Sequence, residues 1–285
     1  MFQHNVNIKK MNSWGIASTV TYFAEPQDEY ELQKILKGSP SNVPRYFLGL
    51  GSNILPAEDQ LDVVVVRMRR CLQNIQYSSE RIGIDAGVSC AKVAKMMLSK
   101  GHRDAVFFAG IPGTMGGALR MNAGAFGGET WRYCLGVDCL DERGHFVHVR
   151  RDELKISYRQ ISLPKDWCII RGWFSFPSKP GEANLIASLL QSRMTKQPIG
   201  QRSCGSVFKN PTNHYAAELI DSLGLKGLQE GEIAISEKHA NFMINHGHAS
   251  GQETLKLMRH VQDLVAQHYG ILLEPEVIIW ENQKS

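Results

Sequence analysis

Apolar and polar positions follow two different periods along this chain, and together they predict a mixture of helices and strands. Ser89 and Ser250 stand where helix N-caps are expected, and Glu253 completes a capping box with Ser250. Gly38 and Gly101 are stop signals. Apolar residues recur at helical spacing, and predict helices, in 26–38, 89–101, 182–197, 214–224 and 250–270.

Strand-like patterns lie between these helices. Residues 61–68 are rich in valine, and 81–87 alternate isoleucine and alanine with other residues. Residues 132–151 form two alternating runs around D-E-R-G, which is typical of a hairpin. Extended segments are also expected at 167–176 and 271–280. Because strands and helices do not alternate strictly, the pattern favours an α+β fold over a doubly wound α/β fold.

The composition of the chain changes near residue 198, where a stretch rich in polar and turn-forming residues follows the helix expected over 182–197. A domain boundary is expected there. At 285 residues the chain is long enough for about two domains, each with its own core. After the boundary, a smaller mixed domain and a final extended segment are expected.

Composition describes an ordinary globular protein of 285 residues, with 43% hydrophobic and 21% charged residues and a net charge of +4. No apolar run approaches the roughly 20 residues of a membrane span. The N-terminus lacks the apolar stretch of a signal peptide, so we expect a cytoplasmic protein without a membrane partner. Its basic clusters are short and lack interleaved aromatic residues, so no nucleic-acid partner is expected.

The cysteines and histidines give no strong metal signal. None of the six cysteines forms a C-x-x-C pair, and we expect reduced, mostly buried thiols. Cys134 and Cys139 lack the second cysteine pair of a zinc site. His246 and His248 have no carboxylate or cysteine near them in sequence, so no metal is expected.

Glycine is concentrated in residues 110–129, GIPGTMGGALRMNAGAFGGE, which contain seven of the chain's 26 glycines. Glycine lets the backbone approach a ligand closely, and successive N–H groups in such turns bind anions. A second glycine turn lies in 48–55, LGLGSNIL. Neither stretch is a P-loop, and Ile54 interrupts G-x-G-x-x-G. From composition alone, the glycines fit either a diphosphate-containing ligand or close internal packing.

Taken in order, these and later motifs resemble the UDP-N-acetylenolpyruvoylglucosamine reductase family, also called UDP-N-acetylmuramate dehydrogenase or MurB. The motifs are LGLGSNIL, AGIPGTMGGALRMNAGAFG, SYR, SCGSVFKNP, AAELIDSLGLKG, ISEKHANFMIN and LEPEVIIW, between about residues 45 and 280. The resemblance implies an α+β fold with a two-part FAD-binding domain of the vanillyl-alcohol-oxidase type and a smaller α+β substrate-binding domain. The parts expected are 1–75 and 76–197 for FAD, 198–270 for substrate, and 271–285 as a C-terminal strand carrying a catalytic glutamate. Residues 200–270 leave no room for the long insertion of the family's longer subtype. The chain therefore resembles the shorter, second subtype.

The resemblance also implies a reaction and its catalytic residues. The family uses NADPH and FAD to reduce UDP-N-acetylglucosamine enolpyruvate to UDP-N-acetylmuramate for peptidoglycan synthesis, with hydride passing from reduced FAD to the enolpyruvyl β-carbon. Arg159 and Glu276 would stabilise the enolate, and Ser206 would supply the proton. Glu276 is preferred to Glu274 because it directly precedes the valine of the motif. Each of these residues also has an alternative without a catalytic role. Arg159 would then be a solvated surface arginine, Ser206 a serine that caps a turn, and a glutamate of the EPE motif an edge-strand surface carboxylate.

Binding residues follow from the same resemblance. At FAD we expect Gly49, Gly51, Ser52, Asn53, Gly110, Ile111, Pro112, Gly113, Gly116, Gly117, Asn122, Ala123 and Gly124. At the substrate we expect Tyr158, Lys209, Asn210 and His239, although His239 also fits a packed or capping residue. The family's N-terminal T-T-F-x-I-G-G is degraded in 12–18, which leaves the adenine and ribose contacts open. The expected partner is a small-molecule UDP-sugar, and the expected state is a monomer.

Two other functions remain open. One is a different flavoenzyme on the same FAD scaffold, such as an alcohol or sugar oxidase, which would share the glycine stretches but lack the 205–211 motif together with Glu276. The other is a flavin-binding or UDP-sugar-binding module without catalysis. The presence of Arg159, Ser206 and Glu276 favours the reductase over both.

Overall fold

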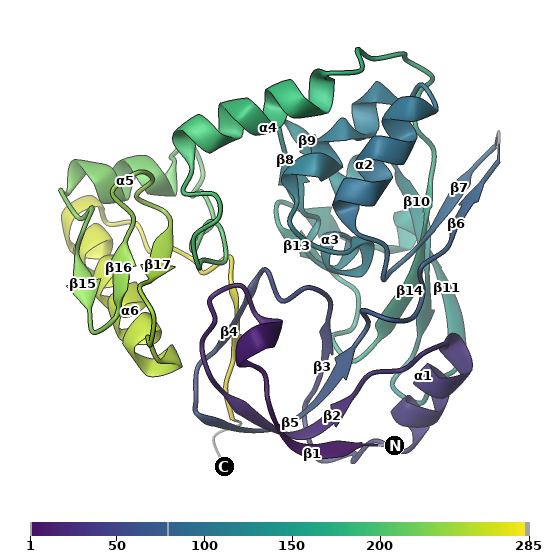
Figure 1. Ribbon diagram of the computed structural model, residues 1–285, viewed down its shortest axis with the longest axis horizontal. Coiled ribbons are helices and arrows are strands. Elements are labelled where there is room, and N and C mark those ends of the chain that lie inside the picture. The colour runs from purple at the N-terminus through teal and green to yellow at the C-terminus, as the bar shows by residue number, and fades with distance from the viewer. Residues whose placement is uncertain (1, 79, 283–285) are drawn as a thin grey trace. The chain divides into compact units, whose positions relative to one another are not determined.

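The computed structural model describes residues 2–78 and 80–282, which form a mixture of helices and sheets (Figure 1). The helices expected from the sequence are confirmed as α1, α2, α4, α5 and α6, and α3 lies inside the glycine-rich stretch, where no helix was expected. The helices are α1 (Glu29–Lys37), α2 (Cys90–Ser99), α3 (Met115–Met121), α4 (Leu185–Lys196), α5 (Ala216–Ser222) and α6 (Gly251–Tyr269), with 3-10 turns η1 (Lys9–Met11), η2 (Arg103–Gly110), η3 (Thr130–Arg132) and η4 (Arg151–Glu153).

The strands form several small sheets, in the orders β1-β2-β5-β3, β11-β10-β14-β7-β6 and β15-β16-β17, with two-stranded pairs β4-β18, β8-β9 and β12-β13. Sequence patterning did not indicate β1 or β2. The bounds are β1 (Gln3–Asn7), β2 (Thr19–Ala24), β3 (Arg45–Leu48), β4 (Ile54–Pro56), β5 (Gln60–Arg67), β6 (Ile75–Tyr77), β7 (Ile82–Asp85), β8 (Gly124–Ala125), β9 (Gly128–Glu129), β10 (Cys134–Leu140), β11 (Phe146–Arg150), β12 (Ile156–Ser157), β13 (Gln160–Ile161), β14 (Cys168–Phe174), β15 (Gln229–Glu230), β16 (Ile233–Ile235), β17 (Met243–Asn245) and β18 (Ile278–Trp280).

Two compact units share the chain, and each is assembled from separate stretches. The first unit comprises Met1–Gln3, Tyr22–Leu50 and Val64–Ser192, and the second comprises His4–Thr21, Gly51–Val63 and Arg193–Ser285. The chain therefore passes from one unit to the other within the LGLGSNIL motif, and again within α4. The four ranges expected from the sequence divide the chain differently, and they stay a prediction.

The core of the first unit lies between the antiparallel sheet β11-β10-β14-β7-β6 and the helices α2 and α3. α2 buries Cys90, Val93, Ala94 and Met97, the i, i+3, i+4, i+7 pattern of an amphipathic helix. Its N-cap is Ser89, whose hydroxyl accepts from the Lys92 N–H at 3.3 Å, as the sequence predicted. α3 packs on β14 and β7, and α2 packs on η2 (Figure 1). This packing places the glycine-rich stretch on a rigid base.

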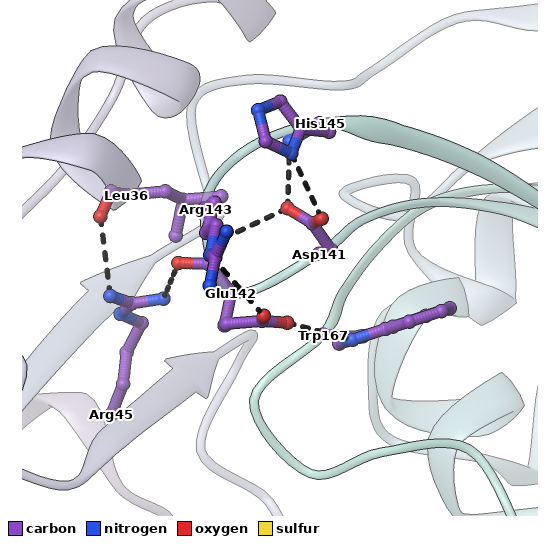
Figure 2. Close-up of polar contacts among 7 residues, drawn as sticks. All are labelled: Leu36, Arg45, Asp141, Glu142, Arg143, His145 and Trp167. Atoms are coloured by element: carbon purple, nitrogen blue, oxygen red, sulfur yellow. Dashed lines mark hydrogen bonds and ion pairs between the residues drawn. The ribbon is translucent and has the colours of Figure 1, made fainter.

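A polar cluster ties α1 and β3 to the turn between β10 and β11 in the first unit (Figure 2). The Arg45 guanidinium donates to the Leu36 carbonyl and to the Glu142 carbonyl, both at 3.2 Å. The Glu142 carboxylate accepts from the Trp167 indole at 3.2 Å. Asp141 accepts from the His145 N–H at 2.8 Å and so closes the turn. These contacts join Leu36 and Arg45 to residues beyond position 140 within the first unit.

In the second unit, α6 covers β15 and β16 and packs against α5. The expected capping box is present: the Ser250 hydroxyl accepts from the Glu253 N–H at 3.1 Å, and the Glu253 carboxylate accepts from the Ser250 N–H at 2.7 Å. Gly270 ends the helix in the left-handed conformation. α6 presents a buried face to the core, including Leu255, Met258, Val261 and Val265.

All six cysteines are free and buried, which confirms the expectation of reduced, buried thiols. Burial raises the pKa of Cys71, Cys90, Cys134 and Cys139 to about 12. These thiols therefore lack the thiolate character that cysteine catalysis and metal binding need. Within residues 2–78 and 80–282, no helix combines the length and apolar content needed to cross a membrane.

Candidate active site

The turn after Leu50 is fixed by the N-terminal part of the second unit. Gly51 has φ +69°, and a side chain there would collide with the Met11 carbonyl and the Asn12 backbone. The Gly51 carbonyl in turn accepts from the Ser13 N–H at 2.9 Å. Gly51 is therefore required by its own backbone conformation and by close packing, whatever ligand lies near it. Ser52 and Asn53 complete the turn and lead into β4.

The C-terminal strand lies beside this turn, although more than two hundred residues separate them in sequence. The Asn53 amide donates to the Glu276 carbonyl at 2.9 Å, and the Asn53 carbonyl accepts from the Ile278 N–H at 3.0 Å. β4 and β18 then pair in parallel, with Ile54 opposite Ile278. This pairing brings the predicted cofactor residue Asn53 to the predicted catalytic residue Glu276.

Ser206 lies on an extended segment held on both sides by backbone hydrogen bonds. On one side, Ser206 forms a β-bridge with Phe242. On the other, the Glu276 N–H donates to the Val207 carbonyl at 2.8 Å, and Phe208 bridges Pro275. The predicted proton donor and the predicted catalytic glutamate are therefore on adjacent backbone segments of the second unit.

Asn241 is a site residue that sequence reasoning did not identify. Its side-chain amide clamps Phe208, accepting from the Phe208 N–H at 3.0 Å and donating to the Phe208 carbonyl at 2.8 Å. Its own carbonyl accepts from the Val207 N–H at 2.9 Å. Asn241 is buried, so these bonds are shielded from water and fix the segment that carries Ser206. A polar residue inside the apolar run of HANFMIN was the available signal.

The two glutamates of the EPE motif have different surroundings. The Glu274 side chain is 72% exposed, and its carboxylate lies 3.2 Å from the Lys209 ammonium. Glu276 is half-buried, and its charge, after burial, contributes to raising the pKa of the Cys204 thiol. Glu276 is therefore less exposed than Glu274, and its backbone is bonded to the segment that carries Ser206. This contrast supports choosing Glu276 as the catalytic candidate.

The other substrate-binding candidates of the second unit have contacts within it. Lys209 pairs with Glu274, and the Asn210 side chain accepts from the Ala216 N–H at 3.1 Å at the start of α5. The ring of His239 stacks edge-on against Phe242 at 4.7 Å, and its Nδ1 accepts from the Asn241 N–H at 3.3 Å. Burial lowers the pKa of His239. His239 is therefore a neutral, packed residue beside the Asn241 clamp, and its role toward substrate stays a prediction.

In the first unit, α3 begins directly after the GIPG turn. The N–H groups of Met115 and Gly116 donate to the carbonyls of Val88 and Ala86, at 2.9 and 2.8 Å. A Cβ on Gly116 would lie 3.0 Å from the Ala86 Cβ, so Gly116 allows close packing of helix on strand. A Cβ on Gly117 would meet open space, and Gly117 is exposed.

Several other glycines of this region are explained by internal packing. A side chain on Gly49 would approach the Thr114 hydroxyl at 2.5 Å, and one on Gly110 would approach Ala125 at 2.5 Å. A side chain on Gly124 would collide with the Gly128 carbonyl. The alternative of close packing, left open from composition, therefore holds for these positions.

The remaining positions of the predicted FAD set also make contacts inside the first unit. The N–H groups of Ile111 and Gly113 donate to the Phe108 and Ile111 carbonyls at 3.1 and 2.9 Å, and Pro112 between them is exposed. The Ala123 N–H donates to the Ala118 carbonyl at 2.9 Å.

Asn122 is the left-handed C-cap of α3, and its amide bonds to Glu129, to the Ser157 carbonyl and to the Trp131 N–H. Its side chain therefore holds the α3 terminus, and a role of Asn122 toward FAD stays a prediction.

Arg159 occupies the second position of the tight turn between β12 and β13, and its φ is +58°. Few residues with a side chain adopt this conformation without strain. Its guanidinium donates to the carbonyls of Asn122 at 3.4 Å and Gly124 at 3.2 Å, and lies 3.9 Å from the Glu129 carboxylate. Only 15% of the side chain is exposed, and the guanidinium also covers the Tyr158 ring at 4.8 Å. Arg159 is therefore a positioned, mostly buried cation rather than a solvated surface arginine.

Two positions of the predicted FAD set are open at the surface of the first unit. Pro112 and Gly117 are exposed, and a Cβ at Gly117 would meet free space in the first turn of α3. Among the side chains of residues 2–78 and 80–282, no three histidines, cysteines, aspartates or glutamates gather around a point where a metal ion would sit. Pro112 and Gly117 of the first unit and the Gly51–Asn53 turn of the second unit each stay predicted cofactor positions.

Two family models match the chain. The one described as FAD binding domain matches residues 20–150, and the one described as UDP-N-acetylenolpyruvoylglucosamine reductase, C-terminal domain, matches residues 197–280. The second match begins next to the boundary expected near residue 198. Together they support the predicted combination of an FAD-binding domain with a separate C-terminal domain.

Proteins similar to this chain over nearly its whole length are named UDP-N-acetylenolpyruvoylglucosamine reductase. One from Coxiella burnetii (strain Dugway 5J108-111) is 41% identical, with 95% of this chain and 93% of the relative covered. Another, from Legionella pneumophila (strain Paris), is 37% identical, with 96% and 92% covered.

A solved structure has the same fold. The crystal structure of the reductase (MurB) from Thermus caldophilus is 28% identical, has a TM-score of 0.81, and covers 99% of this chain and 100% of its own. These similarities confirm the α+β fold class and the FAD cofactor expected from the sequence. The chain belongs to the UDP-N-acetylenolpyruvoylglucosamine reductase family of FAD-dependent oxidoreductases.

Proposed function

We propose that this protein uses NADPH to reduce UDP-N-acetylglucosamine enolpyruvate to UDP-N-acetylmuramate, a step in making peptidoglycan precursors, as a cytoplasmic monomer. The observation that carries the proposal is the 2.8 Å hydrogen bond from the Glu276 N–H to the Val207 carbonyl. It joins the segment of the candidate proton donor to the segment of the candidate carboxyl. Both segments lie within the range matched by the reductase-specific C-terminal model.

FAD, when bound and reduced by NADPH, would supply the hydride needed for a new C–H bond at the enolpyruvyl β-carbon. The electron pair of the C=C bond moves to the α-carbon and spreads into the carboxylate as an enolate. Arg159 steadies this growing charge, because a guanidinium can grip a carboxylate through two parallel hydrogen bonds. Its contacts with the Asn122 and Gly124 carbonyls hold it in position without neutralising it.

Ser206 delivers a proton to the α-carbon, which completes the lactyl ether, and water restores the hydroxyl proton. A serine hydroxyl is a weak acid, so this step depends on the strong basicity of the enolate in a site from which water is largely excluded. Glu276 assists as a protonated or water-linked carboxyl, because an ionised carboxylate would repel the enolate. The Asn241 clamp keeps the Ser206 segment in one conformation.

Substrate binding is assigned to side chains near these residues. Lys209 acts as a point charge for the substrate phosphates, and Asn210 supplies an amide donor beside it. In this proposal Lys209 exchanges its surface partner Glu274 for phosphate. Tyr158 and His239 offer a ring and an imidazole toward the sugar nucleotide.

The test is an anaerobic absorption spectrum of the purified protein followed through two additions. NADPH is added first and should bleach the flavin band. The enolpyruvyl UDP-sugar is added second and should restore it, because the substrate accepts the hydride. A band that stays bleached would overturn the reductase assignment and favour an oxidase with another acceptor. If the purified protein shows no flavin band and does not bind added FAD, the flavin assignment is contradicted as well.

A further inference from the structure

A cavity of about 600 Å³ lies in the second unit, and its lining contains none of the residues assigned to the reductase reaction. Three stretches far apart in sequence form it: Lys9, residues 200–202 and residues 244–248. Its volume is within the roughly 300–1,000 Å³ of typical small-molecule sites. The cavity is therefore large enough for a ligand and separate from the proposed chemistry.

The lining of this cavity is positive. Two of its nine residues, Lys9 and Arg202, have cationic side chains, two more are His246 and His248, and none of the nine is aspartate or glutamate. The nearest carboxylate recorded at its edge is Glu232, 3.9 Å from the position that a Cβ on Gly247 would take. This distribution favours an anion and disfavours a metal cation.

The cationic groups rest on a fixed frame. The Arg202 guanidinium donates to the Gly247 carbonyl at 3.1 Å, and its stem lies against Gly15. Buried Asn245 accepts from the Gly247 N–H at 2.8 Å and donates to the Trp14 carbonyl at 2.8 Å. The 246–248 turn is thus held in one shape, which reduces the ordering needed when a ligand binds.

We propose that this cavity binds a small phosphate-bearing anion, separately from the diphosphate of the reductase substrate. Arginine and lysine are the side chains that recognise phosphate oxygens best, one through a planar fork and the other as a point charge. The two imidazoles add N–H donors on the opposite stretch. A concave site of this size suits a free oligophosphate or a nucleotide rather than a nucleic-acid backbone.

Calorimetric titration of the FAD-bound protein with inorganic pyrophosphate tests the proposal. Arg202→Gln and Lys9→Gln should each weaken binding by about tenfold, the loss of one charge-assisted hydrogen bond. Lys10→Gln is the matched control, because Lys10 is the exposed neighbour of Lys9 and does not line the cavity. Lys209→Gln reports on any pyrophosphate bound where substrate phosphates are proposed to bind, and it should leave the cavity site unchanged.

Three results would overturn the proposal: no measurable binding, equal binding in all variants, or a loss confined to Lys209→Gln. Unchanged melting temperature and flavin absorbance show that each variant is folded, and His246→Gln replaces Arg202→Gln if that variant is not.

A parallel titration with ADP separates the two sources of the anion. Tighter binding of ADP assigns the cavity to a nucleotide, and equal or weaker binding assigns it to a free oligophosphate. Because calorimetry requires no turnover, failure of the reductase proposal would leave this test intact.

Discussion

The side-chain amide of Asn53 donates a 2.9 Å hydrogen bond to the backbone carbonyl of Glu276, across 223 positions of sequence. The same Glu276 peptide donates its N–H to Val207, the residue next to Ser206. One short segment therefore joins the glycine turn of the predicted cofactor set to the predicted proton donor. A shift of this segment would move both the predicted catalytic carboxyl and the turn of the predicted cofactor set.

Replacing Ser206 with alanine should separate the two half-reactions. Flavin reduction by NADPH should be unchanged, because it needs no proton from Ser206, while flavin re-oxidation by substrate should slow by about 10²–10⁴-fold. Stopped-flow absorbance measures both steps. Ser203→Ala, three residues earlier in the same loop, is the control and should behave as wild type. Normal re-oxidation in Ser206→Ala would remove the serine from its role.

Glutamine substitutions at the two glutamates of the EPE motif should have opposite outcomes. Glu276→Gln should slow re-oxidation by about 10²-fold or more, because the amide cannot transfer a proton. Glu274→Gln should leave the chemical step intact, because its carboxylate is 72% exposed and contacts only Lys209 among the interactions described. Single-turnover rates compare the two variants. A slow Glu274→Gln with a normal Glu276→Gln would show that the assignment is reversed.

Arg159 combines a functional guanidinium with an unfavourable backbone conformation, and two substitutions separate these properties. Arg159→Gly and Arg159→Ala both remove the guanidinium and should both slow re-oxidation. Glycine tolerates φ +58° without strain, so Arg159→Gly should be more stable than Arg159→Ala by about 1–2 kcal/mol. Urea unfolding measures the difference. Equal stabilities would mean that the turn relaxes and stores no strain.

Gly116 and Gly117 should respond differently to alanine. In Gly117→Ala the new methyl enters open space, so the fold should keep its stability or gain about 0.5–1 kcal/mol of helix propensity, while FAD retention falls. In Gly116→Ala the methyl meets Ala86 at 3.0 Å, so the protein itself should be less stable than Gly117→Ala. Flavin content and apoprotein melting temperature measure the two effects. Full FAD content in Gly117→Ala would remove this residue from the cofactor site.

His239 should give the protein an acid-sensitive stability. Burial, together with the positive charges of Lys226 and Arg193, lowers the pKa of His239 below its ordinary 6.5. Because the pKa of His239 is lower in the folded protein than in the unfolded chain, the unfolded chain takes up the proton first as the pH falls through 6.5. The free energy of unfolding therefore declines with falling pH until the pKa of His239 in the folded protein is passed. Urea midpoints between about pH 8 and pH 5 should therefore fall less in His239→Gln than in wild type.

The exposed His214 provides the comparison for this titration. His214→Gln, the same substitution at an exposed position, is the matched control for removing a histidine. An identical slope in His239→Gln and wild type would show that other groups determine the acid sensitivity.

Much of the local structure followed from the sequence by itself. Helical periodicity located α2 and α6, and Ser89, Ser250 and Glu253 marked their first turns, because caps and amphipathic faces are interactions between near neighbours. α3 was missed because two glycines in its first turn weaken its helix propensity. Its formation depends on Val88 and Ala86, which accept its first N–H groups.

The order of the motifs in the sequence also determined the family, and with it the cofactor and the candidate residues Arg159, Ser206 and Glu276. Sequence spacing could not determine how these residues are held. The Asn241 clamp on Phe208, the pairing of β4 with β18, and the packing that requires Gly51 all join segments distant in sequence. Such contacts leave no periodic signal, because each depends on where the folded backbone brings a distant donor or acceptor. Tertiary structure alone therefore decided which glycines serve packing, and showed that Glu276 is the less exposed of the two glutamates.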